Sequence, residues 1–333
     1  MKKTSLIVLV LFVLSGSLAF GAGNAEGAGS PVDVGYSIPD TTNPFLGWLT
    51  TEVKKQFEAD GITVQIADAG NNPVKQIEQI ENFIAMNVKV LAIMPIDPNN
   101  VQSVIQQAQK KGIKVLVAGT DTIYYDVMMN MDQYNCGEQI SEMGIEWMID
   151  TFSSDGTAEG LPKGDDKLKV IVMKCTETVD MKNRSNGILD KINDWGYAEV
   201  ITATAEARTT AAATAVMENM WQQNSDAVAV LCYNADGALG VNEYIMGQPS
   251  VDKAEFGVFA GDWSPPIQEM LDKSLTNESV FRGTMQIVGP KINGEQVPLE
   301  KATYMLLKDL YEGKQSYGSV ITDSIQKAHG SAE

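Results

Sequence analysis

The sequence predicts an α/β fold made of two doubly wound, parallel-sheet lobes. Short apolar runs rich in β-branched residues alternate with segments whose apolar residues recur every third or fourth position, as in buried strands and helices. The alternation breaks after Asp132 and then restarts, so it forms two layers of comparable size. Uninterrupted apolar strands such as 88–94 are typical of parallel sheets with both faces covered by helices.

The first strand–helix–strand unit shows the pattern most clearly. A strand is expected at 32–38 and a second one at 62–68. Pro44 fits the first turn of the helix between them, because a missing N–H costs nothing there, and Thr42 or Asn43 fits the cap. The loop before this helix follows the carboxyl end of a strand, where open α/β sheets bind small molecules.

The remaining elements follow the same rule. In the first layer we expect helices at 74–86 and around 101–108, and strands at 88–94, 113–119 and 127–131. In the second layer we expect strands at 168–174, 198–203, 227–231, 256–260 and 280–286, and helices starting at 135 and spanning 182–195, 209–223, 237–246 and 266–271. A helix at 294–311 and a short strand at 320–322 follow, and 153–167 is expected to be an exposed loop.

The first residues have the pattern of a secretory signal peptide. Lys2 and Lys3 precede an apolar run at 6–14, and small residues follow as far as Gly23. That run is too short to span a bilayer, and no later segment is long and apolar enough. We therefore expect residues 1–23 to be removed and the mature protein to act in the periplasm without stable membrane insertion.

Composition excludes several classes of function. A formal net charge of −18 argues against nucleic acid or an anionic membrane surface as partner. The one histidine, His329, lies in the C-terminal tail, which argues against histidine-based catalysis and histidine-rich metal sites. No metal or cofactor is expected. There are three cysteines, so full pairing within the chain is excluded, and we expect buried free thiols at Cys175 and Cys232, which both end apolar runs.

Polar side chains gather at the expected carboxyl ends of the strands. A sugar or polyol needs such a mixture, because each hydroxyl both donates and accepts, while an aromatic face covers the apolar side of a ring. If the two layers face each other, these loops converge on one cleft. The set comprises Ser37, 40–45, 68–72, Asp97, Thr120, Asp121, 176–184, 206–208, 234–236, Asp262, Trp263 and Gln286.

These residues also have structural interpretations. Three of them suit helix caps equally well: Asn43, Asp97 and Asn234. Phe45 shares an apolar stripe with the core side of its helix. Asp180 and Arg184 stand four residues apart at a helix start and fit a local ion pair. Arg208 fits a solvated surface arginine.

Seven stretches form a specific combination along nearly the whole mature chain. They are NPF at 43–45, NNP at 71–73, VLAIMPID at 90–97, D-x-x-x-R-x-x-G at 180–187, the segment 216–240, VFAGDW at 258–263 and the strand ending at Gln286. Together they resemble the type I periplasmic solute-binding proteins of the ribose- and galactose/glucose-binding group, which serve carbohydrate ABC importers.

The resemblance implies a binding site. It implies Asn43 and Phe45 as polar and stacking contacts from the first lobe, and Asp180 with Arg184 as a hydroxyl-binding pair from the second. Trp263 would add a stacking wall. The full set of expected substrate-binding residues is Asn43, Phe45, Asp121, Asp180, Arg184, Arg208, Asn234, Asp262, Trp263 and Gln286.

The sequence differs from the family at positions that are expected to contact the ligand. Leu46 stands where ribose binders have a second aromatic residue, Met94 where an asparagine is common, and Arg208 where ribose binders have an aromatic. The resemblance implies a monosaccharide, a hexose or pentose, as the ligand, and the departures favour an alternative to it. The alternative is a polyol, a cyclitol or a sugar-like signal molecule that feeds chemotaxis or quorum sensing.

The resemblance also implies the domain plan and the partners. The lobes would comprise 31–131 plus 287–321 and 132–286 plus 322–333, with hinges near 131–133, 286–287 and Thr322. We expect a monomeric receptor rather than an enzyme, delivering its ligand to a membrane permease. No G-x-G-x-x-G follows the first strand and no Walker A motif is present. A glycosidase using Asp180 and Asp262 remains the enzymatic alternative.

Overall fold

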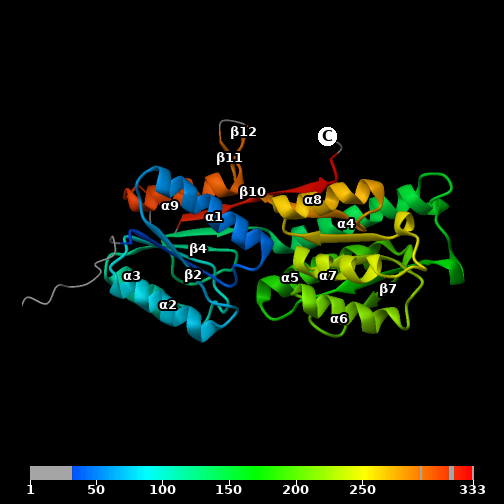
Figure 1. Ribbon diagram of the computed structural model, residues 1–333, viewed down its shortest axis with the longest axis horizontal. Coiled ribbons are helices and arrows are strands. Elements are labelled where there is room, and N and C mark those ends of the chain that lie inside the picture. Colours follow the sequence, from blue (N-terminus) through cyan, green and yellow to red (C-terminus); the bar gives the residue numbers. More distant parts are fainter. Residues whose placement is uncertain (1–31, 293–294, 315–318, 332–333) are drawn as a thin grey trace, which may run out of the picture. The chain divides into compact units, whose positions relative to one another are not determined.

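Two six-stranded sheets carry the fold, and helices pack on both faces of each (Figure 1). The computed structural model describes residues 32–292, 295–314 and 319–331. The predicted signal peptide at 1–23 lies outside these residues. Within the described ranges, none of the helices has the length and apolar character needed to cross a bilayer.

The first sheet is parallel throughout, in the order β13-β5-β4-β3-β1-β2. Its strands are β1 Val34–Ile38, β2 Val64–Asp68, β3 Val90–Ile93, β4 Lys114–Ala118, β5 Val127–Asn130 and β13 Ser319–Thr322. Its helices are α1 Pro44–Ala59, α2 Pro73–Ala85, α3 Gln102–Lys110 and α9 Leu299–Tyr311. We call this sheet and these helices the first lobe.

The second sheet repeats the order as β14-β10-β9-β8-β6-β7. Its strands are β6 Leu168–Met173, β7 Ala198–Thr202, β8 Ala227–Cys232, β9 Gly257–Gly261, β10 Phe281–Val288 and β14 Ser324–His329. With its helices, it forms the second lobe. Those helices are α4 Gln133–Phe152, α5 Val179–Trp195, α6 Thr210–Trp221, α7 Ala235–Met246 and α8 Pro265–Lys273. The predicted class, two parallel α/β lobes, is confirmed.

Smaller elements complete the described chain. Short 3₁₀ turns span Ala158–Gly160, Gly164–Asp166, Lys253–Glu255 and Ser274–Thr276, and β11 Lys291–Ile292 pairs antiparallel with β12 Glu295–Gln296. The first two of these turns lie in the segment predicted as an exposed loop.

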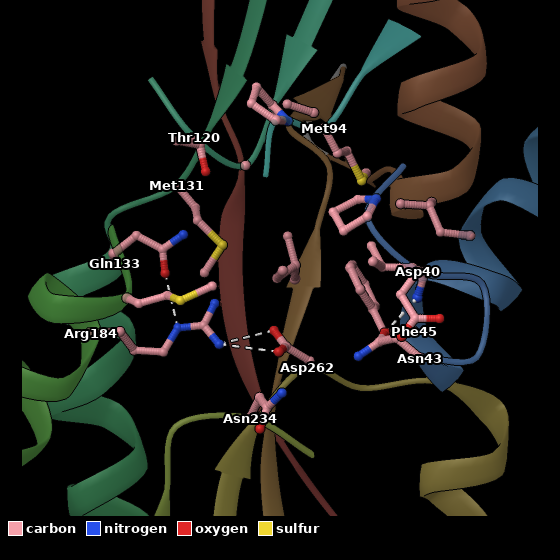
Figure 2. Close-up of a pocket in the computed structure, with 18 of the residues that line it drawn as sticks. Asp40, Asn43, Phe45, Met94, Thr120, Met131, Gln133, Arg184, Asn234 and Asp262 are labelled. Carbon is pink, nitrogen blue, oxygen red and sulfur yellow. Dashed lines mark hydrogen bonds and ion pairs between the residues drawn. The ribbon is translucent and has the colours of Figure 1, made fainter. Parts of the chain in front are cut away.

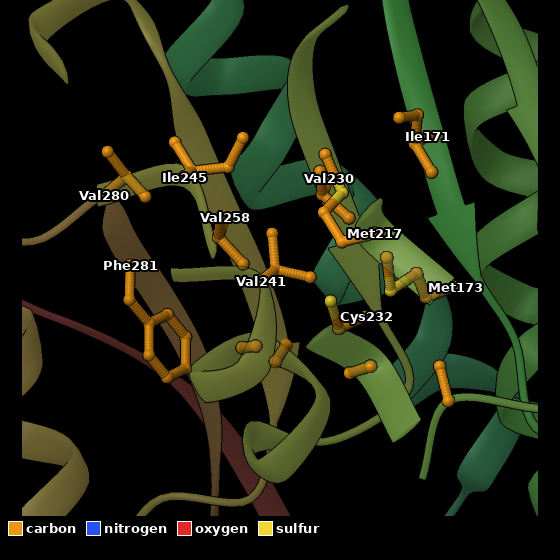
Figure 3. Packing of buried hydrophobic residues seen from close by; sticks show 14 of the residues in the cluster. Ile171, Met173, Met217, Val230, Cys232, Val241, Ile245, Val258, Val280 and Phe281 are labelled. Atoms are coloured by element: carbon orange, nitrogen blue, oxygen red, sulfur yellow. The ribbon is translucent and has the colours of Figure 1, made fainter. Parts of the chain in front are cut away.

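Alternation along each buried strand explains the packing. In β3, Val90 and Ala92 join the apolar cluster on one face of the first sheet, while Leu91 and Ile93 join the cluster on the other face. The second sheet is sandwiched in the same way, and Figure 3 shows strand and helix side chains interlocking in one of its clusters. Both sheets are therefore buried on two faces, as their continuous apolar strands predict.

The strand orders determine where a ligand can bind. In each sheet, one strand (β1 or β6) has neighbours reached by connections running in opposite directions, which makes a switch point at its carboxyl end. Crevices for ligands open at such points in doubly wound sheets. The loops after β1, β3, β6 and β8 are therefore the structural candidates for the site.

The chain passes between the lobes three times. It leaves the first sheet after β5, returns from β10 to α9, and leaves again between β13 and β14 at Asp323. The predicted hinges at 131–133 and Thr322 lie at or next to two of these passages. β10 continues for two residues past the predicted boundary at Gln286, and Ile287 and Val288 pair with β14.

Two segments differ from the prediction. The helix expected at 294–311 begins only at Leu299, because Glu295 and Gln296 pair in β12. The tail that contains His329 is strand β14, which runs antiparallel along β10. Its sequence, SIQKAH, is short and polar, so it carries too little apolar signal to be recognised as an edge strand.

Candidate functional site

A cavity of about 220 Å³ lies at the carboxyl ends of strands from both sheets. The first lobe contributes residues from the loops after β1, β3 and β4, and the second contributes residues from α5 and from the loops after β8 and β9. Figure 2 shows Asp40, Asn43 and Phe45 on one side, Gln133 and Arg184 on the other, and Asp262 between them. The switch points of both sheets therefore open into one space.

Arg184 is the charged centre of the second-lobe wall. Its side chain is only 4% exposed, and Nη1 lies 3.1 and 3.2 Å from the two carboxylate oxygens of Asp262. Nε donates to Gln133 Oε1 at 2.9 Å, and Nη1 also donates to the carbonyl of Tyr233 at 3.1 Å. The guanidinium lies 4.7 Å from the Tyr233 ring centre. Four groups thus hold one arginine in a single orientation.

The buried charge is stabilised by its partner. Burial is the largest single influence and would lower the pKa of Arg184, but the charge of Asp262, with smaller contributions from Cys136, Tyr233 and the hydrogen bond to Asp262, gives a net rise. Asp262 adopts a left-handed backbone conformation, with φ at +73°, immediately after β9. Such a conformation is uncommon outside glycine, and it turns the carboxylate toward Arg184. The local ion pair of Arg184 with Asp180, considered from the sequence, is not formed; Arg184 pairs with Asp262 instead.

Asn43 joins the two lobes. Its Oδ1 accepts from the N–H of Leu46 at 2.9 Å and caps α1, with Pro44 at the first turn as predicted. Its Nδ2 donates to Asp236 Oδ2 of α7 at 2.5 Å. Asn43 is therefore both a cap and a cavity-lining group. The two interpretations offered from the sequence are compatible.

Asp236 is the acidic group opposite Asn43. Burial raises its pKa to about 6, and the nearby charges of Asp262 and Asp40 add to that rise, while the hydrogen bond from Asn43 and the charge of Arg208 oppose it. No cation forms an ion pair with Asp236 among the described residues. Asp236 therefore keeps its proton at pH values up to about 6.

Asn234 and Arg208 form the floor beside α6 and α7. Asn234 caps α7 by accepting from the Gly237 N–H at 3.0 Å, and its amide donates to the Arg208 carbonyl at 2.9 Å. The Arg208 guanidinium is paired with Glu177 at 3.3 Å and its side chain is 26% exposed. Both residues line the cavity. The Asn234 side chain works mainly as a cap, and Arg208 is a partly buried, paired arginine.

A large part of the cavity lining is apolar, and we call these residues together the apolar wall. It is contributed mostly by the first lobe and the chain passages, and it comprises Phe45, Leu46, Leu49, Met94, Met129, Met131, Met181, Ile287 and Leu299. Phe45 is the aromatic ring of this wall. Leu46 and Met94, the two departures noted in the sequence, are both on it.

Six of the ten predicted residues line the cavity, and the other four lie outside its lining. The six are Asn43, Phe45, Arg184, Arg208, Asn234 and Asp262. The four are Asp121, Asp180, Trp263 and Gln286. Gln286 lies on β10 and accepts from the amide of Gln326 at 2.7 Å. Trp263 donates to Gln268 at 2.7 Å and packs edge-on against Trp48 of the first lobe, with ring centres 5.5 Å apart.

Asp180 and Asp121 meet each other across the rim. Burial raises the pKa of Asp180, while hydrogen bonds from the Thr120 hydroxyl and the Asp121 N–H lower it. Asp121 is exposed. These two residues therefore connect α5 of the second lobe with the loop after β4 of the first, beside the cavity rather than in its lining.

Several lining groups were not predicted from the sequence. Asp40 and Asp236 belong to the strand-end loops 40–45 and 234–236 that were expected to border the cleft, but neither was predicted individually as a site residue. Gln133, Tyr233 and Asp323 were not selected either, although all three line the cavity. The position of Asp236 could have indicated it as a site residue, because it stands two residues after Asn234, which follows the end of a strand. Gln133 and Asp323 lie where the chain passes between the lobes. The sequence predicts a hinge at such a position, but it does not predict which way a side chain points.

The site holds few groups suited to metal binding or to nucleophilic catalysis. In the described ranges, no cluster of three or more His, Cys, Asp or Glu side chains is arranged to hold a metal ion. The three cysteines are free and buried, which agrees with the thiols predicted at Cys175 and Cys232. Burial raises the pKa of Cys136 to about 11 and that of Cys175 to about 12, so neither is a ready nucleophile.

Two α/β lobes whose strand ends enclose a cavity lined by polar and apolar side chains form an architecture in which small molecules bind. The family model for a periplasmic binding protein domain matches residues 34–287. That match covers more than half of the chain, so the protein belongs to this family. The family predicted from the seven sequence stretches is confirmed.

Individual relatives agree with this assignment. The chain is 25% identical over 214 residues to the ribose import binding protein RbsB of Bacillus subtilis, which covers 64% of this chain and 65%, just under two thirds, of that relative. It is 23% identical over 326 residues to the D-galactose/methyl-galactoside binding periplasmic protein MglB of Haemophilus influenzae, covering 95% of this chain and 91% of the relative.

A solved structure supports the fold. An ABC transporter periplasmic solute binding protein from Actinobacillus succinogenes, with bound D-allose, superposes with a TM-score of 0.71 over 89% of this chain and 96% of that one. The two sequences are 15% identical, so this likeness concerns the fold alone.

Proposed function

We propose that the protein is an exported receptor that captures a small carbohydrate, a hexose or pentose, between its two lobes and delivers it to an ABC importer. The observation that carries the proposal is the cavity itself. It combines fixed donors, acidic acceptors and an apolar wall that includes the ring of Phe45. That combination matches the hydroxyl groups and the C–H face of a sugar. Family membership and the names of the relatives support the same ligand class.

Each group has a distinct part in the proposed binding. Arg184 uses Nε and Nη1 for the hydrogen bonds described above, so Nη2 is the nitrogen that would donate to a sugar hydroxyl. Asp262 and Asp236 would accept from hydroxyl groups, and Phe45 would cover the apolar ring face. Because Arg184 is already oriented by four partners, little conformational entropy is lost when it binds the ligand.

Closure would follow from sharing the ligand between lobes. A sugar that contacts Asn43 and Phe45 from the first lobe and Arg184 and Asp262 from the second touches all four only when the lobes approach. Its differential affinity therefore favours the closed form. The lobe boundaries at 31–131 plus 287–321 and 132–286 plus 322–333 belong to this proposal, as do the hinges, the monomeric state, the signal peptide at 1–23 and the periplasmic location.

A second candidate is a cyclitol or polyol, with the protein feeding transport or signalling. Leu46 on the apolar wall supports it, because an aliphatic side chain gives a pyranose ring less stacking surface than the second aromatic that ribose binders have. The hydrogen-bonding groups would serve either ligand class. The first experiment below therefore includes both.

The glycosidase alternative lacks its carboxylate pair. Asp262 is paired with Arg184, and Asp180 is outside the cavity lining and bonded to Thr120. A glycosidase built on Asp180 and Asp262 would need these two carboxyl groups on opposite sides of one bound substrate. We therefore propose a receptor and not an enzyme.

The proposed function is tested by a thermal-shift and calorimetry panel on the mature chain. The panel contains D-ribose, D-galactose, D-allose, D-xylose, glycerol and myo-inositol. One tight ligand at a hundredfold excess over its Kd should add about 2.7 kcal/mol to the free energy of unfolding and raise Tm by several degrees. A polyol or cyclitol as the single tight binder would select the second candidate. No binding across the panel would contradict the carbohydrate proposal.

A further inference from the structure

Asp323 lies where the chain makes its third passage between the lobes. It separates β13 of the first sheet from β14 of the second. Its backbone N–H donates to the carbonyl of Asn130 at 2.8 Å, which anchors this point to the end of β5. On the other side, the pairing of Ser324 with Val288 anchors it to β10. Backbone bonds from both lobes therefore fix where the Asp323 side chain starts.

Asp323 is one of the residues that line the cavity, and one oxygen of its carboxylate is not satisfied. Its Oδ1 is buried and has no hydrogen-bond partner in the part of the chain that the structure describes. No cation is paired with it there either. Burial is the one cause that shifts its pKa, which rises to about 7. A buried acceptor without a partner costs about 1–3 kcal/mol, and more when it is charged, so native structures rarely keep one without a reason.

The cavity is the space from which a partner can come. Arg184 is committed to Asp262, and Arg208 to Glu177. The neighbouring Asn130 amide oxygen accepts from the N–H of Met131 at 2.8 Å. These groups do not satisfy Oδ1 of Asp323, whereas a ligand hydroxyl that reached the carboxylate from the cavity would give it a partner.

We propose that Asp323 is a ligand-contacting, specificity-determining residue whose carboxylate accepts a hydrogen bond from one hydroxyl group of the bound sugar. The inference rests on the proposed carbohydrate function and deepens it. A ligand with a hydroxyl at that position gains a charge-assisted hydrogen bond in a low-dielectric site. A ligand without it leaves a buried carboxylate unpaired, which is the stronger penalty. Asp323 would thereby distinguish between ligands that differ at one ring position.

A hydroxyl fits the site better than an amine. Apolar side chains, among them Phe45, Met129 and Ile287, line the same cavity as Asp323 and favour a neutral molecule. An amino sugar is nevertheless a useful comparison, because the two ligand kinds give opposite results in the test.

The test compares the wild-type chain with Asp323→Asn, which has nearly the same shape but no negative charge. The control is Asp252→Asn, an exposed cap of a 3₁₀ turn outside the cavity lining, where asparagine still accepts from the Ala254 N–H. Calorimetry is run with the tightest sugar of the panel, with each of its singly deoxygenated derivatives and with its amino derivatives. Far-ultraviolet circular dichroism checks the fold, and Asp323→Ser is a second variant should Asp323→Asn fail to fold.

The wild type should bind one deoxygenated derivative about 10- to 100-fold more weakly than the parent sugar. Asp323→Asn should bind the parent about 10- to 100-fold more weakly and should no longer distinguish it from that derivative. Asp252→Asn should behave as the wild type. This loss of discrimination separates a ligand contact from a structural role, which would weaken all sugars equally.

Equal weakening of all sugars in Asp323→Asn would overturn the inference, and two further results would do so while leaving the proposed function standing. One is an Asp323→Asn variant with wild-type affinity and wild-type discrimination. The other is a wild type that binds an amino derivative more tightly than the parent in a manner that depends on Asp323. If the wild type binds no sugar at all, the proposed function fails and the inference falls with it.

Discussion

Arg184 shows how one residue can serve both the fold and the site. Its guanidinium is almost fully buried and is held by Asp262, Gln133 and the Tyr233 carbonyl, so removal leaves Asp262 as a buried charge without its partner. Breaking a buried pair in this way costs more than forming it gains. The same arginine would also donate to the ligand.

Arg184→Ala should therefore lower both affinity and stability. We expect sugar binding to weaken about 30-fold or more, and the free energy of unfolding to fall by about 3 kcal/mol. Chemical denaturation and calorimetry measure the two effects. The matched control is Arg282→Ala, because Arg282 bonds the carbonyls of Phe256, Ser274 and Lys253 outside the cavity lining. That variant should lose stability but keep its affinity. Unchanged affinity in Arg184→Ala would remove Arg184 from the site.

Asp323 makes the stability of the ligand-free protein depend on pH. Its pKa of about 7 in the folded chain exceeds the value of about 3.9 in an unfolded chain, so the folded state binds more protons between these values. The corresponding stability is fully present below about pH 4 and is lost as pH rises through about 7. Asp236, with a pKa raised to about 6, acts in the same direction.

Asp323→Asn should cancel the larger part of this dependence. Relative to the wild type, the variant should gain on the order of 2 kcal/mol in free energy of unfolding between pH 5 and pH 8. Urea denaturation at the two pH values measures the difference, with Asp252→Asn as the variant that should show none. A difference that shrinks as pH rises would contradict the burial of this carboxyl.

At this scale the sequence predicted residue types better than residue roles. Asn43, Arg184 and Asp262 could be found because they follow strands in a family pattern. That Arg184 pairs with Asp262 and not with Asp180 depends on a left-handed turn at Asp262, which no local pattern announces. The orientation of the Asp323 side chain depends on β5 and β10, two strands that lie far from it in the sequence.

The contact between α4 and α5 is the element-scale feature on which the site depends. α4 carries Gln133 and α5 carries Arg184, so the hydrogen bond between them requires the two helices to lie close. Glycines permit this approach. A Cβ added at Gly137 would lie 2.0 Å from the Arg184 carbonyl oxygen, and one added at Gly187 would lie 2.1 Å from the Tyr134 carbonyl oxygen.

Gly187→Ala should therefore push the two helices apart. We expect the free energy of unfolding to fall by roughly 2 kcal/mol or more and sugar affinity to drop with it, because the Gln133–Arg184 bond would lengthen. Thermal denaturation and calorimetry provide the readouts. Gly247→Ala is the control, since its φ is −74° and an added Cβ would meet its nearest atom at 3.3 Å. A Gly187→Ala variant as stable as the control would show that the contact is not tight.

Most elements could be predicted because both sheets are buried on two faces. Continuous apolar strands and amphipathic helices then give strong local signals, as in β3 and α1. The missed elements are those without such a signal: β14 is a polar edge strand, and the residues of β12 were assigned to the start of α9. Their positions depend on pairing partners, which a single sequence does not contain.

At the scale of the whole molecule, the two lobes meet through few direct contacts around the cavity. Asn43 bonds Asp236, Trp48 packs on Trp263, and Asp180 meets the loop after β4. The repeated strand order brings the switch point of each sheet to the same space. The sequence predicted this convergence from its repeated α/β units, while the shape of the cavity depends on side chains from both repeats.

The central claim is that a sugar binds in the cavity and contacts both lobes at once. A crystal structure of the mature protein with the tightest sugar of the panel tests it most directly. We predict electron density for the sugar between Phe45 of the first lobe and Arg184 and Asp262 of the second, with hydrogen bonds to both lobes. A sugar bound at another surface, or contacting only one lobe, would contradict the account.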